Sequence, residues 1–177
     1  MTEPLSPSSS HHHHRRDAVA DVVTVVITVS DTRTLETDKG GALVAEQLEA
    51  AGHSVSSRQI VKDEPVAIRG AVETALSTDG VRAVILTGGT GVAPRDVTPE
   101  AVQPLLEREV PGFGELFRML SYEDIGSAAL LSRALAGLAR GRVVFVVPGS
   151  SGAVRLAMEK LILPELGHLA SEAVKTR

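Results

Sequence analysis

The 177-residue chain has no cysteine and no tryptophan, and aromatic residues make up only 2% of it. Without cysteine it forms no disulfide, thiolate metal site or cysteine nucleophile, which fits a reducing compartment. Its aromatic residues are Phe113, Phe117, Tyr122 and Phe145. They are too few to build the base-stacking surface that single-stranded nucleic-acid binders use. The absences therefore argue against cysteine chemistry and RNA recognition.

A strong charge excess and long hydrophobic runs are also missing. The 18 Lys and Arg residues face 22 Asp and Glu residues, for a formal charge of −4, so the overall field does not favour nucleic acid or an anionic membrane. No apolar run reaches the roughly 18–20 residues that span a bilayer, and we find no signal-peptide pattern. We expect a cytoplasmic protein whose partners are small molecules or proteins, with no nucleic acid and no membrane.

The composition that remains, 43% hydrophobic and 23% charged, predicts one globular domain. The first residues differ from the rest, because they combine prolines, a serine run and His11 to His14 with no apolar periodicity. We predict that residues 1–20 form a disordered tail, either low-complexity or tag-derived. Residues 21–177 then form the single domain.

Hydrophobic patterning in the first half predicts three strand-to-helix units. The expected strands are Val22–Val29, His53–Val61 and Ala83–Leu86, and amphipathic helices follow the first two over residues 40–51 and 68–76. The first strand is almost continuously β-branched, the pattern of a parallel strand buried on both faces. Units of about 30 residues require parallel pairing and right-handed crossovers.

The second half predicts further helices and a hairpin. Strand-like runs at Ala134–Leu138 and Arg142–Val147 are separated by three residues, which would add an antiparallel strand to the sheet. Helical stripes cover residues 99–106, continue from Phe113, and resume from Val154. We therefore predict an α/β fold, a three-layer α/β/α arrangement around a mostly parallel, mixed central sheet.

One stretch, residues 86–101, combines a strand end, three glycines and a helix start. Gly88, Gly89 and Gly91 permit positive φ and close backbone approach. Thr98 would supply a capping hydroxyl before Pro99 at the first helical position. Such a turn aims free N–H groups at the crevice beyond the strand, where open α/β sheets bind ligands. An ordinary tight turn is the alternative.

A second glycine turn, Pro148 to Gly152, directly follows the apolar run RVVFVV. If the two preceding strands are near neighbours, both turns meet at one sheet edge. Neither turn fits G-x-G-x-x-G, and G-x-x-x-x-G-K-[ST] is absent. A dinucleotide-binding dehydrogenase and a P-loop NTPase are therefore both disfavoured.

Two acids are expected at that edge. Asp63 follows the second strand and Asp96 lies in the loop after the third. Two carboxylates and substrate phosphates are a usual setting for Mg²⁺ in nucleotide-transfer sites. Alternatively, both acids only close turns. His53 and His168 lack partners at metal-ligand spacing and receive no role, and Lys39 and Arg133 stay unassigned.

Taken together, these motifs resemble the MoaB/Mog family of molybdenum-cofactor biosynthesis proteins, which includes the G domain of gephyrin. The resemblance is carried by TGGTG at residues 87–91 and PRDVTPEA at residues 94–101. It extends to VITVSD at 26–31, DKG at 38–40, VKDE at 61–64, PGFGE at 111–115, LSR at 131–133 and PGS at 148–150. It thus spans about residues 22–166.

The resemblance implies a molybdopterin-binding fold and an adenylyltransferase that uses Mg²⁺ and ATP to transfer AMP to molybdopterin, releasing pyrophosphate. Asp63 and Asp96 match the family's two acidic positions at the metal and nucleotide, and are the implied catalytic and metal-binding residues. The implied substrate-binding residues are Gly88, Gly89, Thr90, Gly91, Ser132, Pro148, Gly149 and Ser150.

It also implies a homo-oligomer, a trimer or a hexamer, and a molybdate-insertion protein as a candidate partner. Phe113 and Phe117 are expected in the core or an interface, and together with Met119 they would supply apolar area for subunit contacts. Residues 109–125 resemble the MoaB branch, some members of which lack adenylylation. A non-catalytic molybdopterin carrier or scaffold is therefore the alternative function, and an unrelated nucleotide-binding α/β domain is a third.

Overall fold

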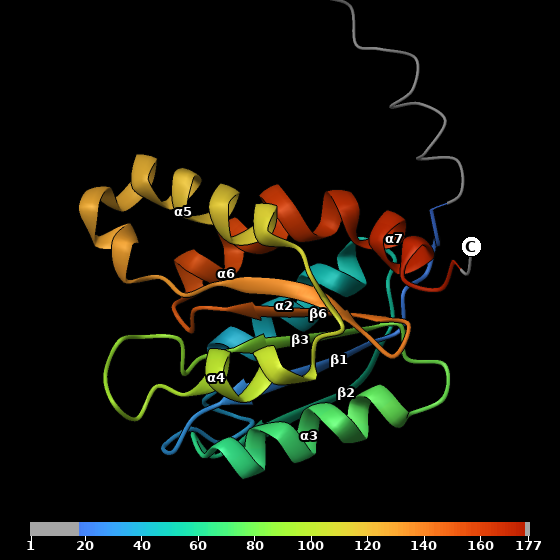
Figure 1. Ribbon diagram of the computed structural model, residues 1–177, viewed down its shortest axis with the longest axis horizontal. Coiled ribbons are helices and arrows are strands. Elements are labelled where there is room, and N and C mark those ends of the chain that lie inside the picture. The colour runs from blue at the N-terminus through green and yellow to red at the C-terminus, as the bar shows by residue number, and fades with distance from the viewer. Residues whose placement is uncertain (1–17, 176–177) are drawn as a thin grey trace, which may run out of the picture.

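A computed structural model of the protein describes residues 18–175 and shows a six-stranded sheet covered by helices (Figure 1). The strands are β1 (Thr24–Val29), β2 (Val55–Val61), β3 (Ala83–Thr87), β4 (Arg108–Glu109), β5 (Leu135–Ala139) and β6 (Arg142–Val147). Their order is β2-β1-β3-β6-β5-β4. The first four in this order are mutually parallel, whereas β5 is antiparallel to both β6 and β4. The predicted α/β class with a mixed, mostly parallel sheet is confirmed.

Helices lie on both faces of the sheet, which gives three layers (Figure 1). One face is covered by α2 (Lys39–Ala50), α5 (Pro111–Ile125), α6 (Ser151–Ala157) and α7 (Leu163–Glu172), and the other by α3 (Pro65–Ser77) and α4 (Thr98–Val102). Short 3₁₀ segments follow α4 at Gln103–Leu105 and α5 at Gly126–Leu131. A π-helical turn, Met158–Ile162, joins α6 to α7 just before Pro164, which has no N–H to continue a regular helix.

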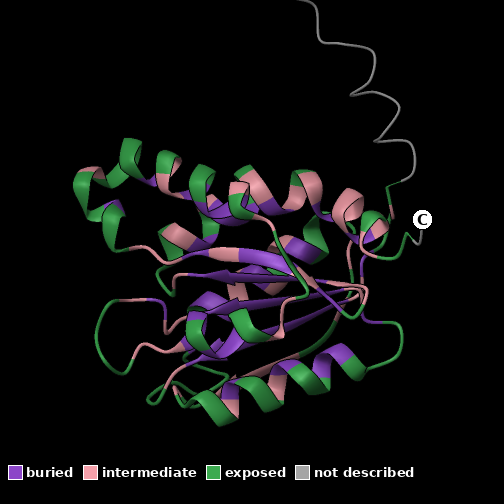
Figure 2. Ribbon diagram, in the orientation of Figure 1, coloured by how far each residue is buried: buried purple, intermediate pink, exposed green. Residues whose placement is uncertain are grey.

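The core consists of two apolar layers, one on each side of the sheet. The central strands β1 and β3 are buried along their whole length, and β6 is buried from its second residue; the purple strands in Figure 2 lie between half-exposed helices. Burial on both faces explains why these strands are continuous β-branched and aliphatic runs rather than alternating ones. Among residues 18–175, no helix has both the length and the apolarity needed to cross a bilayer.

Three details differ from the sequence-based expectations. The short strand β4 was not predicted; its two residues are exposed, and only pairing with β5 defines it. The helix expected over 99–106 is split into α4 and a 3₁₀ turn. The predicted capping role of Thr98 is wrong, because Val97 occupies the N-cap and the Thr98 hydroxyl donates to the Gly88 carbonyl at 2.9 Å.

The predicted N-terminal tail lies mostly outside the described residues, which begin at 18. Within them, the Val19 amide donates to the Gly167 carbonyl at 3.1 Å, and the Val19 side chain packs against the core. Contact with the domain therefore begins before Asp21, where the domain was expected to start.

Candidate functional site

The two glycine turns meet at the carboxyl end of the central strands. β3 and β6 are parallel neighbours, and Thr87 pairs with Val147 at their ends. The Gly88 amide donates to the Val147 carbonyl at 3.1 Å, and the Thr87 hydroxyl donates to the Pro148 carbonyl at 3.2 Å. The turns pack so closely that a Cβ atom on Gly149 would lie 3.2 Å from the Gly88 Cα. The predicted convergence is thus present in the fold.

The glycine loop after β3 needs glycine for two physical reasons. Gly88 and Gly89 have φ values of +99° and +63°, in the region that side chains disfavour. A Cβ on either would also collide with a neighbour, the Val29 carbonyl for Gly88 and the Thr98 hydroxyl for Gly89. Gly91 does not have a positive φ; this position needs glycine for the close approach that was expected, because the Asp96 carboxylate lies against it.

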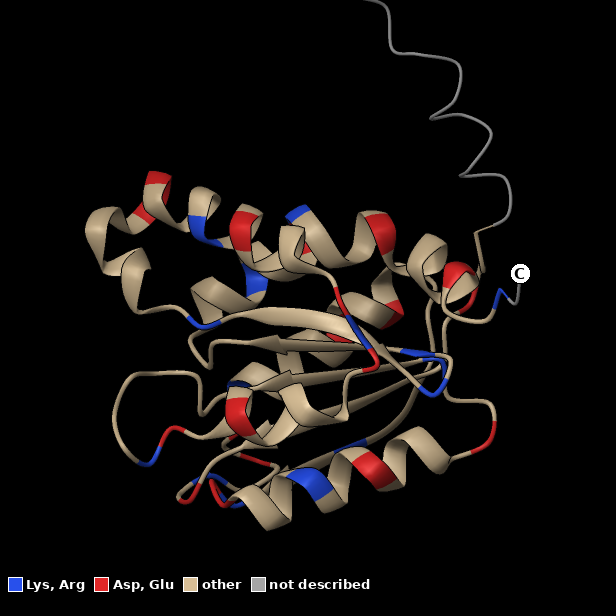
Figure 3. Ribbon diagram, in the orientation of Figure 1, with Lys and Arg blue, Asp and Glu red and all other residues tan. Residues whose placement is uncertain are grey.

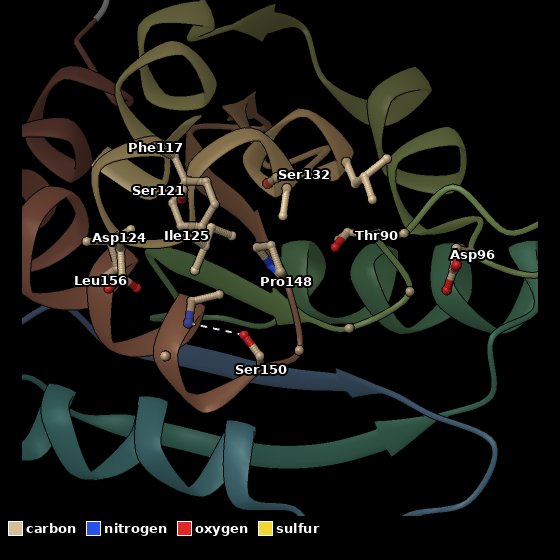
Figure 4. A pocket seen from close by; sticks show the side chains of 18 residues that line it. Thr90, Asp96, Phe117, Ser121, Asp124, Ile125, Ser132, Pro148, Ser150 and Leu156 are labelled. Atoms are coloured by element: carbon tan, nitrogen blue, oxygen red, sulfur yellow. Dashed lines mark hydrogen bonds between the residues drawn. The ribbon is translucent and has the colours of Figure 1, made fainter. Parts of the chain in front are cut away.

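A cavity of about 430 Å³ opens where the turns meet (Figure 4). All the predicted site residues except Asp63 line it: Gly88, Gly89, Thr90, Gly91, Asp96, Ser132, Pro148, Gly149 and Ser150. The amides of Gly89, Thr90 and Gly91 donate to no acceptor within residues 18–175. The Ser132 hydroxyl is buried and likewise has no hydrogen-bond partner in the described part of the chain. The cavity wall therefore presents unsatisfied donors suited to an anionic ligand.

Asp63 does not line the cavity, although its carboxylate lies beside the glycine loop, close to Gly89. Its Oδ1 accepts a hydrogen bond from the Val97 amide at 3.4 Å, and its own amide donates to Asp31 at 3.1 Å. Burial raises the pKa of the Asp63 carboxyl, and the nearby charges of Asp96 and Asp31 raise it further, against the opposing effect of the Val97 hydrogen bond. The two predicted acids are thus close enough to interact electrostatically, although only Asp96 lines the cavity.

The family comparison agrees with this geometry. The family model described as "Probable molybdopterin binding domain" matches residues 25–168. The chain belongs to the molybdopterin-binding domain family. A relative from Bacillus subtilis (strain 168), named Molybdenum cofactor biosynthesis protein B, is 58% identical over 153 residues, which cover 86% of this chain and 90% of that protein.

Solved structures give the same result for this molybdopterin-binding domain. A crystal structure of a Molybdenum cofactor biosynthesis protein B is 57% identical, with a TM-score of 0.85, and covers 86% of this chain and 96% of that one. The structure of the tungsten cofactor synthesizing protein MoaB from Pyrococcus furiosus is 36% identical, with a TM-score of 0.76. The match covers 89% of this chain and 100% of that one. The resemblance expected from the sequence motifs is confirmed.

Arg133, which received no role from the sequence, is a structural clamp on the glycine loop of this domain. Its guanidinium donates to the Thr90 carbonyl at 3.2 Å and to the Asp96 carbonyl at 2.6 Å. It also forms an ion pair with Glu100 at the start of α4. One side chain thus joins both ends of the loop and the helix that follows. The only sequence signal was its position directly after Ser132, since the three partners lie 33 to 43 residues away.

The helical wall of the cavity was also not predicted from the sequence. It comes from α5, the 3₁₀ segment after it, and α6, and it includes Phe117, Ser121, Asp124, Ile125, Ala128, Leu131 and Leu156. Phe117 was expected in the core or an interface; it is 1% exposed, so it is a core residue, and one edge also faces the cavity. Helical periodicity identified the buried stripe but gave no information on which end of the helix faces the glycine loop.

The isolated histidines lie away from the cavity. The His53 Nδ1 atom accepts a hydrogen bond from the Val22 amide at 3.2 Å, and burial lowers the pKa of this imidazole. His168 pairs with Glu165 and Glu172 along α7. In the described residues, no group of three or more His, Cys, Asp or Glu side chains is arranged to hold a metal by itself.

Proposed function

We propose that this protein acts in molybdenum cofactor biosynthesis and adenylylates molybdopterin with Mg²⁺ and ATP. The terminal phosphate oxygen of molybdopterin would attack the α-phosphorus of ATP, forming a new P–O bond as the bond to the β-phosphate bridging oxygen breaks and pyrophosphate leaves. The observation that carries the proposal is the meeting of two glycine turns at one cavity that also contains Asp96 and Ser132. The names of the relatives in this family support the pathway.

In this proposal the glycine loop binds phosphate oxygens through its backbone. The free amides of Gly89, Thr90 and Gly91 donate to the phosphates, and the Ser132 hydroxyl gains the partner it lacks in the protein alone. Because Arg133 hydrogen-bonds to the carbonyls of Thr90 and Asp96, the loop that carries these donors is already ordered before substrate arrives. Positioning and charge neutralisation supply most of the catalysis in phosphoryl-type transfers.

The acids fit a magnesium ion by their chemistry. Asp63 uses only Oδ1 and Asp96 only Oδ2 in hydrogen bonds within residues 18–175, so each has a carboxylate oxygen available. Burial raises the pKa of Asp63, and Asp96 and Asp31 raise it further against the opposing effects of Val97 and Arg95, so a bound cation would favour the ionised form. Mg²⁺ is commonly held by one or two carboxylates together with substrate phosphates, and when bound it neutralises phosphate charge and makes the α-phosphorus more electrophilic.

Pyrophosphate release tests this function. Purified protein with molybdopterin, ATP and Mg²⁺ is expected to release pyrophosphate in proportion to adenylylated product. Asp96→Asn and Asp63→Asn are expected to lower kcat about 100-fold or more, the scale seen when a preorganised electrostatic group is removed. Asp79→Asn, an exposed acid between α3 and β3, is the matched control and should retain activity. Unchanged turnover in both site variants, with circular dichroism showing intact folds, would contradict the proposal.

A non-catalytic pterin-binding role is the second candidate. The observation that favours it is the position of Asp63, which does not line the cavity and is hydrogen-bonded to Val97. If this acid only fastens the loop, calorimetry should show molybdopterin binding while no pyrophosphate is released.

A further inference from the structure

A second concave site lies at the opposite end of the sheet from the glycine turns. The turn between β5 and β6 is the blue segment at the right of the sheet in Figure 3, whereas the glycine loop after β3 lies at the left in Figure 1. A cavity of about 260 Å³ opens beside this turn, and it is lined by Gly80, Val81, Arg82, Arg140, Gly141, Arg142 and Val174. Three arginines and no acid thus line a cavity that the proposed function does not use.

Arg82 and Arg142 are neighbours on adjacent parallel strands. Ala83 of β3 lies beside Val143 of β6, and the Val143 amide donates to the Arg82 carbonyl at 3.0 Å. Because each arginine comes one residue before that pair, the two side chains leave the same face of the sheet. Like charges on neighbouring strands destabilise each other. Neither guanidinium forms an ion pair within residues 18–175, so no acid offsets this repulsion.

The guanidinium groups also have unused donors. The Arg142 Nη1 atom donates to the Arg140 carbonyl at 2.6 Å, but its Nε atom is buried and has no partner in the described part of the chain. The Arg82 side chain makes no hydrogen bond there. Glu107 accepts from the Arg140 amide at 3.1 Å, outside the cavity lining. Unpaired N–H groups around a cavity are donors that a bound ligand can satisfy.

Arg140 has a backbone conformation that its turn disfavours for an arginine. The hairpin loop between the paired residues Ala139 and Arg142 consists of Arg140 and Gly141, with φ values of +50° and +70°. Such a loop prefers Asn, Asp or Gly at its first position, and Arg140 is the one non-glycine residue with positive φ among residues 18–175. Its Nη1 atom donates to the Ser77 hydroxyl at 3.2 Å. Strained positions of this kind cluster at ligand-binding sites.

We propose that these three arginines bind a phosphate-type dianion, either a free tetrahedral oxyanion or the terminal phosphate of a small molecule. The guanidinium groups of Arg82 and Arg142 donate to its oxygens, for which their planar fork is better suited than an ammonium group. Arg140 adds a third positive charge from the turn. The dianion offsets the repulsion between the first two and pairs their unused donors. The site is independent of the proposed function, because it lies at the opposite ends of β3 and β6.

Amide chemical shifts measured by NMR test this assignment, because they report the two ends of the sheet separately. Inorganic phosphate and glycerol 3-phosphate are the probes, and sodium chloride at matched ionic strength is the reference. Phosphate is expected to shift the Gly80 and Gly141 amides to saturation, and the probe that binds more tightly identifies a free ion or a phosphorylated molecule as the ligand. Arg82→Gln and Arg142→Gln should each weaken this binding about tenfold, the effect of one lost charged hydrogen bond.

Arg140→Asn separates a binding role from a structural one. Asparagine tolerates the left-handed conformation, so the variant should unfold at a higher temperature than wild type in phosphate-free buffer. It should nevertheless bind phosphate about fivefold more weakly at Gly80 and Gly141, because one positive charge is lost. A lower unfolding temperature with unchanged phosphate binding would show that Arg140 only supports the hairpin, and would contradict its part in the site.

The controls keep this proposal distinct from the proposed function. Arg69→Gln removes an exposed arginine of α3 outside the cavity lining, and should leave phosphate binding unchanged. Shifts at Gly89 and Gly91 report any binding at the glycine turns, and they do not bear on the arginine site. If chloride reproduces the Gly80 and Gly141 shifts, or if these shifts persist in both Gln variants of the strand arginines, the proposal is overturned while the proposed function is unaffected.

Discussion

At the scale of single residues, Asp63 is the side chain on which the fold and the proposed chemistry conflict. Burial and two neighbouring carboxylates raise its pKa, so its ionised form is less stable in the folded chain than in the unfolded one. A residue kept for structure alone would be better served by a neutral acceptor for the Val97 amide. The retained charge is explained if a cation is bound during the reaction.

Asp63→Asn is therefore expected to raise the thermal unfolding temperature at pH 7.5. For an acid whose folded pKa is raised, the penalty is absent below the unfolded pKa of about 3.8 and grows as pH rises through the folded value. The difference between variant and wild type should consequently shrink as pH falls toward 4. Thermal melts at several pH values, followed by circular dichroism, measure this. A variant less stable than wild type at neutral pH would contradict it.

Magnesium provides the complementary measurement. Millimolar Mg²⁺ should raise the unfolding temperature of the wild-type protein, because an ion bound only by the folded state stabilises it. The increase should be smaller in Asp63→Asn. Asp79→Asn again serves as the control, since this exposed acid lies at the end of α3, outside the cavity lining.

At the scale of elements, the glycine loop between β3 and α4 depends on a residue from outside it. Arg133 precedes β5 and reaches the Thr90 carbonyl, the Asp96 carbonyl and Glu100. Because Ser132 is its chain neighbour, the same contacts fix the position of the buried Ser132 hydroxyl. The glycine loop and the residues just before β5 thus form one structural unit beside the cavity.

Arg133→Lys is expected to loosen this unit while keeping the charge, because an ammonium group lacks the planar fork that reaches all three acceptors. Amide hydrogen exchange over residues 89–96 should become faster, and KM for molybdopterin should rise about tenfold, the effect of one or two lost hydrogen bonds. Arg155→Lys is the matched control, since within residues 18–175 the Arg155 side chain pairs with Glu159 alone, four residues along the same helical segment. Unchanged exchange in the loop would show that Arg133 does not order it.

At the scale of the whole molecule, the apolar surface differs from the one expected. Phe113 and Phe117 were expected in the core or an interface; they are 7% and 1% exposed and pack in the core, so they supply no interface area. The exposed apolar residues of α5 and the following 3₁₀ turn are instead Leu116, Met119, Tyr122, Ile125, Leu130 and Leu131. All six belong to one helix and the turn that follows it, and grouped exposed apolar residues often mark interaction sites. The helix α5 lies at the outer edge of its layer in Figures 1 and 2.

The charge distribution leaves this surface available for self-association. Figure 3 shows charged residues on both sides of the molecule, with basic and acidic positions interspersed along α5 rather than collected into one patch. A cavity of about 600 Å³ between α5 and α7, lined by Phe113, Leu116 and Leu169 among others, continues the apolar surface. Such a surface suits a closed symmetric oligomer better than a charged partner.

We expect a trimer or hexamer, with a mass three or six times the 18.6 kDa of the chain. Leu116→Glu combined with Met119→Glu should dissociate it, because each charge would be buried at the interface. Multi-angle light scattering at micromolar concentration measures the mass. Val66→Glu, an 82% exposed apolar residue on α3, is the control and should leave the mass unchanged. A monomeric wild-type protein would contradict the prediction.

The sequence by itself determined the strands and the glycine turns of this protein. β-branched runs and glycine-bearing turns follow from local sterics, so the strands that end at Thr87 and Val147 were expected within a residue or two. Neighbouring parallel strands then required their turns to meet. The family motifs identified nearly all of the residues on the glycine side of the cavity.

Only the tertiary structure decided what surrounds those turns. It left Asp63 beside Gly89 but outside the cavity lining, brought Arg133 onto the loop from about 40 residues away, and put Ser121 and Asp124 in the cavity wall formed by α5. It also decided that Phe113 and Phe117 belong to the core rather than to an interface. The physical reason is that helical periodicity shows which side of a helix is apolar, whereas its rotation and end-to-end placement depend on packing against distant segments.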